Sequence, residues 1–95
     1  MNHLRVSDIC ADTLTNAAGY ALYTAVENSI AQSDLVEVSF EGTNGISSSF
    51  LNSSVGALIE KHGIEVLSQI KLVKISGTQA DVLKKFVNSA KKQFA

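Results

Sequence analysis

Three consecutive serines, Ser47–Ser49, follow the glycine-bearing segment Gly42–Gly45 and precede an apolar stretch. Glycine and asparagine tolerate the positive φ angles of turns, so residues 42–45 are expected to form a loop. A helix is expected to begin at the serines, because a serine hydroxyl accepts a hydrogen bond from a free N–H group of the first helical turn. Those N–H groups and the helix dipole would also stabilise a phosphate on one of the hydroxyls. Two interpretations therefore stay open: a structural cap, and an exposed site of binding or modification.

The other residues that could support catalysis or metal binding form no recognised pattern. His3, His62 and the single cysteine, Cys10, are not at the spacing of metal ligands. Nucleophile-elbow, HExxH and Walker sequences do not occur in the chain. Glu37 and Glu41 share a face of a predicted strand and are interpreted as solvated carboxylates. We therefore expect a protein that is not an enzyme and that uses no cofactor or metal.

Apolar periodicity predicts three strands, each followed by a helix. The strands are expected around residues 4–7, 35–40 and 67–75. Asp12 or Thr13 is expected to cap the first helix, which would bury Leu14. The second helix should run from the serines to His62-Gly63, and a capping box of Thr78 and Asp81 should open the third. The buried face of this third helix is predicted to consist of Val82, Leu83, Phe86, Val87, Ala90 and Phe94.

The order β-α-β-α-β-α predicts a small α/β fold with a mostly parallel or mixed sheet. The predicted strands alternate, and they place Arg5, Glu37, Ser39 and Lys71 on a common polar face. A sheet covered on both sides would have almost continuously apolar strands. Helices are therefore expected mainly on one face. With 95 residues, the chain is expected to be one domain, 1–95.

Charge is distributed unevenly along the chain. Residues 1–60 carry a net charge of −6 and residues 61–95 carry +5, which favours either self-association, for example a homodimer, or steering of a charged partner. The last predicted helix carries lysines but no arginine, and neither tyrosine is near it in the sequence to stack on bases. Nucleic-acid binding is therefore not expected. No segment has the apolar length of a membrane span or the pattern of a signal peptide, and a cytoplasmic location is expected.

The segment from the second strand into the second helix resembles the STAS-like domain family of unknown function. That family is related to the STAS domains of anti-sigma-factor antagonists and sulfate transporters. The resemblance covers residues 13–94, and the matching positions of its motif are Phe40, Gly42, Ile46, Ser48, Ser49, Phe50 and Leu51. In the antagonists the corresponding motif is Asp-Ser-Ser-Gly, and its second serine is phosphorylated by a partner kinase of the GHKL ATPase type.

The resemblance implies a regulatory module of bacterial type that binds a protein, either a GHKL-type ATPase or another regulator. Aligned on Gly42, the phosphorylated position falls on Ser49, which implies a phosphoserine switch. Ser47 replaces the aspartate of the antagonists and Phe50 replaces their glycine. The residues implied in docking are Asn44, Gly45, Ser47, Ser48, Ser49 and Phe50. Two alternatives are a self-associating structural domain and a module that binds a small anion or nucleotide at the start of the second helix.

Overall fold

The computed structural model describes residues 2–94, with side chains as far as Gln93. Three parallel strands form one sheet in the order β1-β2-β3, as expected for a STAS-like α/β fold. The strands are β1 (Asn2–Arg5), β2 (Val36–Ser39) and β3 (Ile70–Val73). The helices are α1 (Val6–Ile9), α2 (Asn16–Gln32), α3 (Ser48–Ser53), α4 (Val55–His62), the 3-10 helix η1 (Ile64–Gln69) and α5 (Gly77–Phe94). None of the helices in this part of the chain is long and apolar enough to cross a bilayer.

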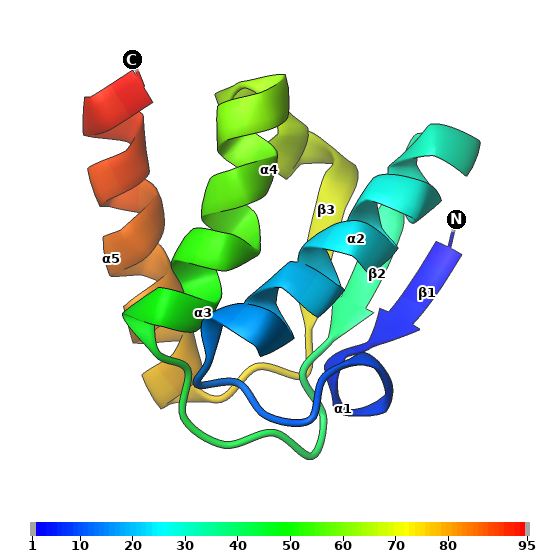
Figure 1. Cartoon of the computed structure of the whole chain (residues 1–95). Coiled ribbons are helices and arrows are strands. Elements are labelled where there is room, and N and C mark those ends of the chain that lie inside the picture. The colour runs from blue at the N-terminus through cyan, green and yellow to red at the C-terminus, as the bar shows by residue number, and fades with distance from the viewer. Residues whose placement is uncertain (1, 95) are drawn as a thin grey trace.

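Helices α2 and α4 lie over one face of the sheet in Figure 1, and α5 lies beside α4, farther from the strands. Strand register places His3, Glu37 and Lys71 in one row on the opposite face, with Arg5 and Ser39 in the next row. The prediction of a common polar face is therefore confirmed. Side chains of this face interact along the strands' surface: His3 Nδ1 lies 3.2 Å from Glu37 Oε1, and Arg5 pairs with Glu41 at 3.4 Å.

The hydrophobic core lies between the helices and the inner face of the sheet. Val36 and Val38 of β2 are 0% and 1% exposed, because the central strand is flanked on both edges and covered by helices. Val26 contributes from α2 and Leu58 from α4. Most of the core residues belong to α2, β2, α3 and α4. The loop between β2 and α3 is therefore attached at both ends to elements that are packed into the core.

Helix α2 passes very close to α3 at Gly19. A Cβ atom built on Gly19 would lie 2.0 Å from Ser53 Oγ and 2.4 Å from the carbonyl oxygen of Phe50. Such separations are well inside van der Waals contact, so this crossing requires glycine. The helical pattern in the sequence predicts α2 but does not reveal the close approach.

Glu27 joins α2 to the C-terminal end of α4. Its carboxylate accepts a hydrogen bond from Lys61 Nζ at 2.8 Å and contacts His62 Nε2 through its other oxygen. The Lys61 ammonium, and then the hydrogen bond to His62, lower the pKa of Glu27. The prediction that His62-Gly63 ends the helix is correct: Gly63 has φ 89° and donates its N–H group to the Ile59 carbonyl.

Several predicted details of the helices are wrong. Helix α2 is capped by Thr15, whose hydroxyl accepts the Ala18 N–H, while Asp12 bonds to the turn before it. Leu14 therefore precedes the helix and is 59% exposed. The second predicted helix is divided into α3 and α4 at the buried Ser54, whose φ and ψ of −111° and −83° are not helical.

The third strand is shorter than predicted, because residues 64–69 form η1. The apolar phase slip after Leu72 arises because Val73 pairs with Ser39 in the outer row of the sheet; the strand then ends, and Lys74 adopts φ 58°. The capping box of α5 consists of Ser76 and Gln79, not Thr78 and Asp81: Ser76 N–H donates to Gln79 Oε1, and Gln79 N–H donates to Ser76 Oγ. The side chain of Phe94 lies outside the described residues.

Candidate functional site

The serine loop (residues 42–49) leads from the carboxyl end of β2 into α3, includes the first two residues of that helix and runs along one end of the molecule in Figure 1. It starts with a turn in which the Thr43 N–H group donates to the Phe40 carbonyl at 3.1 Å and Gly42 has φ 81°. Few residues other than glycine adopt this left-handed conformation. The turn therefore directs the chain away from the sheet and towards the start of α3.

Ser47 is the residue that caps α3. Its hydroxyl accepts the Phe50 N–H at 3.1 Å and donates to the Leu14 carbonyl at 2.7 Å. Its own N–H group donates to the Thr13 carbonyl at 3.1 Å. Ser47 therefore has a structural role: its bonds cap α3 and join the serine loop to the segment before α2.

Ser48 and Ser49 occupy the first two positions of α3 and are exposed. The first N–H groups of a helix have no acceptor within the helix. Both residues therefore present a hydroxyl and a backbone donor at the same end of α3. This is the position that the sequence analysis assigns to them.

Phe50 differs from its predicted role in docking. Its side chain is 0% exposed and belongs to the hydrophobic core. A partner that binds the loop from outside cannot touch it. The bulky residue at the position of the antagonists' glycine therefore anchors α3 from within and leaves the surface over the serines uncovered.

The middle of the serine loop is held by two side chains that the sequence analysis does not identify as part of the site. Thr13 donates its hydroxyl to the Gly45 carbonyl. Gln79, from α5, donates to Thr43 Oγ1 at 2.8 Å and to the Asn44 carbonyl. The S-x-x-Q spacing of Ser76 and Gln79 is a recognisable capping box, but its second role in holding the loop depends on tertiary structure.

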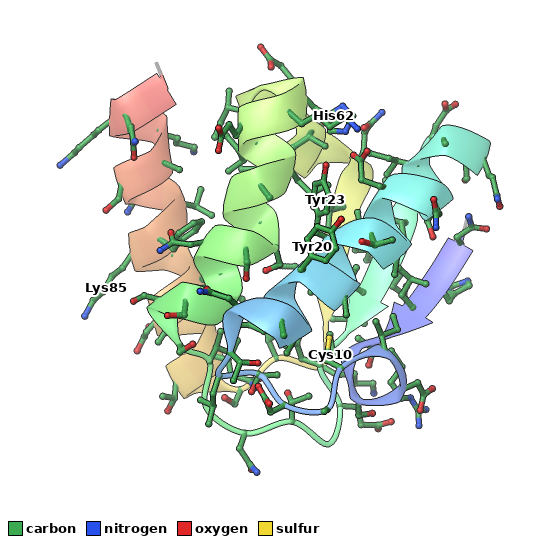
Figure 2. The ribbon with its side chains drawn as sticks, viewed as in Figure 1. Cys10, Tyr20, Tyr23, His62 and Lys85 are labelled. Atoms are coloured by element: carbon green, nitrogen blue, oxygen red, sulfur yellow. The ribbon has the colours of Figure 1, made fainter. Side chains whose placement is uncertain are left out.

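Two large side chains, Leu14 and Tyr20, are exposed in the segment before α2 and on α2 itself. Leu14 and Tyr20 are 59% and 63% exposed. Leu14 is hydrogen-bonded to the serine loop through its carbonyl, and Tyr20 stacks on Tyr23 with ring centroids 5.8 Å apart. Figure 2 shows the two tyrosines together on the side of α2 that faces α4. Leucine and tyrosine side chains thus lie exposed beside the start of α2.

Ser48 also borders a groove between α3–α4 and α5. Two adjoining hollows of about 450 and 290 Å³ share Ser48, Phe86 and Ser89 in their walls. Lys85 lines the smaller hollow, and Figure 2 shows its side chain extending from the outer side of α5. Helix α5 therefore contacts α3 loosely along this side, with a polar rim above the ring of Phe86.

Each histidine and the cysteine contacts a polar atom of another segment or turn. His3 lies beside Glu37, His62 contacts Glu27, and Cys10 Sγ donates to the Ala18 carbonyl at 3.2 Å. Burial, and then the charge of Asp12, raise the pKa of the Cys10 thiol. Within residues 2–94, no group of three or more His, Cys, Asp or Glu residues is arranged to hold a metal ion.

Comparison with known protein families matches residues 18–80 to the STAS-like domain of unknown function (DUF4325). The matched region is about two thirds of the chain, and it extends from α2 through the serine loop to the first turn of α5. Comparison with curated proteins and with solved structures gives no significant match. The parallel sheet, the helices on one face and the matched region agree with one another, and the chain belongs to the family of STAS-like domains of unknown function.

Proposed function

We propose that this chain is a non-catalytic regulatory module that binds another protein at its serine surface, which consists of the exposed residues Leu14, Asn44, Gly45, Ser48 and Ser49. One observation carries the proposal. Two exposed serines begin α3 on a loop that hydrogen bonds immobilise from both sides. A surface that is ordered before binding loses less conformational entropy when a partner binds.

The composition of the surroundings supports a protein partner. Leu14 extends 59% of its surface into solvent, and the exposed Tyr20 follows on α2. Tyrosine is enriched at the centres of protein interfaces, where it combines a large apolar area with a hydrogen-bonding hydroxyl. The serine hydroxyls would add the directional contacts that fix the orientation of the partner. The partner that the resemblance to anti-sigma-factor antagonists suggests is a cytoplasmic GHKL-type ATPase or kinase, or another regulator.

The proposal includes a phosphoserine switch at Ser49. This residue is exposed at the second position of α3, within reach of a kinase and beside free backbone donors. A phosphate would add close to two negative charges to a surface that has no ion pair at that point. A partner that packs apolar or acidic groups against Leu14 and Ser49 would then be released.

Nuclear magnetic resonance titration of the labelled chain with a purified GHKL-type ATPase tests the docking. Amide shifts concentrated at the serine surface, and a loss of binding of about tenfold for Ser49→Asp, are expected. Ser68→Asp is the matched control, because Ser68 is likewise an exposed serine but lies on η1, outside the serine surface. Equal weakening by the two variants, or shifts confined to the outer face of the sheet, would refute docking through the serines.

A second candidate, self-association, is favoured by the uncovered sheet face. Parallel sheets are usually covered on both sides, yet His3 is 67% and Arg5 54% exposed here at the side chain. Glu37 and Lys71 are oppositely charged neighbours on this face, and a second copy could pair with them. Light scattering at rising salt tests this, since a mass that stays monomeric at all salt concentrations contradicts electrostatic self-association.

A further inference from the structure

A cavity of about 280 Å³ lies at the carboxyl ends of β1 and β2, apart from the exposed serines. One wall is formed by residues 10–14 and the other by residues 42–45, with Val6 and Ser7 of α1 between them. The volume is just below the range of pockets for drug-sized ligands, so it suits a group about as large as one long side chain.

The walls of the cavity carry one negative charge and no positive charge. No lysine, arginine or histidine is among the lining residues, and Asp12 is their one carboxylate. Asp12 Oδ1 accepts the N–H groups of Leu14 and Thr15 at 2.8 and 3.0 Å and also the Thr15 hydroxyl. These bonds all go to one oxygen, so the lone pairs of Oδ2 remain for another donor.

Asp12 is ionised under neutral conditions, because hydrogen bonds, chiefly from the Leu14 N–H group, lower its pKa. The same charge contributes to the raised pKa of the Cys10 thiol, after the larger effect of burial. Its negative potential therefore extends to the inner wall of the cavity. Cys10, which is 8% exposed, and the exposed Ala11 offer apolar surface there, whereas Val6 behind them is 0% exposed.

We infer that this cavity binds an organic cation, a guanidinium or primary ammonium group on a short aliphatic stem, with the charged end at Asp12 and the stem against Cys10 and Ala11. A cation satisfies the available carboxylate oxygen, and a charge-assisted hydrogen bond is the stronger kind. An anion would meet Asp12 without a compensating positive group. The cation can be a free small molecule or a lysine or arginine side chain of a protein. Leu14, Asn44 and Gly45 belong both to the cavity wall and to the serine surface, but Ser48 and Ser49 do not line the cavity, so the inference does not depend on docking at these two serines.

Titration of the isotopically labelled chain with four probes of similar shape tests the charge preference: n-butylguanidinium, n-butylammonium, n-butanol and butyrate. Saturable shifts of the amides of residues 10–14 and 42–45 are expected with the two cations. The neutral alcohol and butyrate should bind at least about tenfold more weakly, as expected when a charge-assisted contact is lost. Equal shifts with butyrate, or no saturable shift with either cation, would overturn the inference.

Asp12→Asn should weaken cation binding by about tenfold or more while keeping an oxygen for the Leu14 and Thr15 N–H groups. Asp8→Asn is the matched control, since Asp8 is exposed on α1 and does not line the cavity. The probe series on the unaltered chain decides the same question if Asp12→Asn does not fold. The capped peptide acetyl-Ala-Arg-Ala-amide separates the sources: tighter binding than butylguanidinium supports a protein side chain, and weaker binding supports a free small molecule.

Discussion

The side-chain amide of Gln79 donates to the hydroxyl of Thr43 at 2.8 Å, which joins the first turn of α5 to the loop after β2. The same amide donates to the Asn44 carbonyl, while Oε1 accepts the Ser76 N–H at 3.0 Å. Gln79 is 4% exposed, so water cannot easily replace these bonds. One buried side chain thus caps α5 and holds the segment that presents the exposed serines.

Gln79→Ala should lower the free energy of unfolding by about 2–3 kcal/mol, because it removes the acceptor for Ser76 and leaves buried polar groups of the loop unpaired. Urea denaturation measures the loss. Hydrogen exchange at residues 43–46 should also become faster than in the parent chain. A loss below about 0.5 kcal/mol with unchanged exchange would show that Gln79 does not hold the loop.

Two variants make this test specific. Gln79→Glu keeps an acceptor for the Ser76 N–H group but has no amide to donate to Thr43 and Asn44. It should speed exchange in the loop while α5 keeps its first turn. Gln32→Ala, at the exposed last position of α2, should change stability by no more than about 0.5 kcal/mol.

Gly19→Ala should destabilise the fold by about 2 kcal/mol or more. Alanine favours a helix over glycine by about 1 kcal/mol, but the new Cβ would overlap Ser53 Oγ and the Phe50 carbonyl oxygen, and the backbone oxygen cannot turn aside. Thermal and urea unfolding show whether Gly19→Ala raises or lowers the free energy of unfolding. Gly56→Ala is the comparison: its Cβ would lie 3.2 Å from the outer end of the half-buried Phe86 ring, which can move, so little change or a small gain is expected.

Stability should fall in acid partly through Glu27. Hydrogen bonds to Lys61 and His62 lower its pKa in the folded chain, so the stabilisation is complete above the unfolded value, about pH 4.3, and is lost as the pH falls through the lower folded value. Glu27→Gln should remove about 1 kcal/mol at neutral pH and flatten the acid side of the stability curve. Glu60 is exposed on α4, and Glu60→Gln should leave the dependence of stability on pH unchanged. If the parent chain and Glu27→Gln showed the same dependence, Glu27 would not be a source of the loss of stability in acid.

Much of this fold can be predicted from the sequence because its signals are local. The alternation of Val36, Val38 and Phe40 gives the central strand and its buried face, and glycine after His62 ends α4. The serine run predicts the start of α3 for the same local reason. The polar outer face follows from period-two alternation, which register then aligns across the three strands.

The remaining features depend on contacts between distant segments, which local patterns do not contain. Leu14 fits a helical apolar stripe but lies before the cap at Thr15, so it is exposed. The break at Ser54 depends on burial against the core, where its hydroxyl donates to the Phe50 carbonyl at 2.7 Å. The bond between Gln79 and Thr43 spans 36 positions. These long-range contacts also form the candidate site, which is why it is less predictable than the strands.

The three neighbouring serines should separate into one structural and two functional residues. Ser47→Ala should cost about 1 kcal/mol, as the loss of a helix cap does, because it removes the acceptor for the Phe50 N–H group and the bond to Leu14. Ser48→Ala and Ser49→Ala should each stay within about 0.5 kcal/mol, since both are exposed. Urea denaturation of the three single variants gives these values under identical conditions.

The same variants connect stability to docking. If Ser48 and Ser49 serve a partner, their alanine variants should bind it more weakly while unfolding at the parent's urea concentration, because exposed hydroxyls contribute to recognition without supporting the core. Ser47→Ala should affect binding only as far as it loosens the start of α3, and hydrogen exchange at Phe50 reports that loosening. A cost for Ser48→Ala or Ser49→Ala equal to that of Ser47→Ala would mean that these serines, too, hold the helix in place, and the docking proposal would lose its two contact residues.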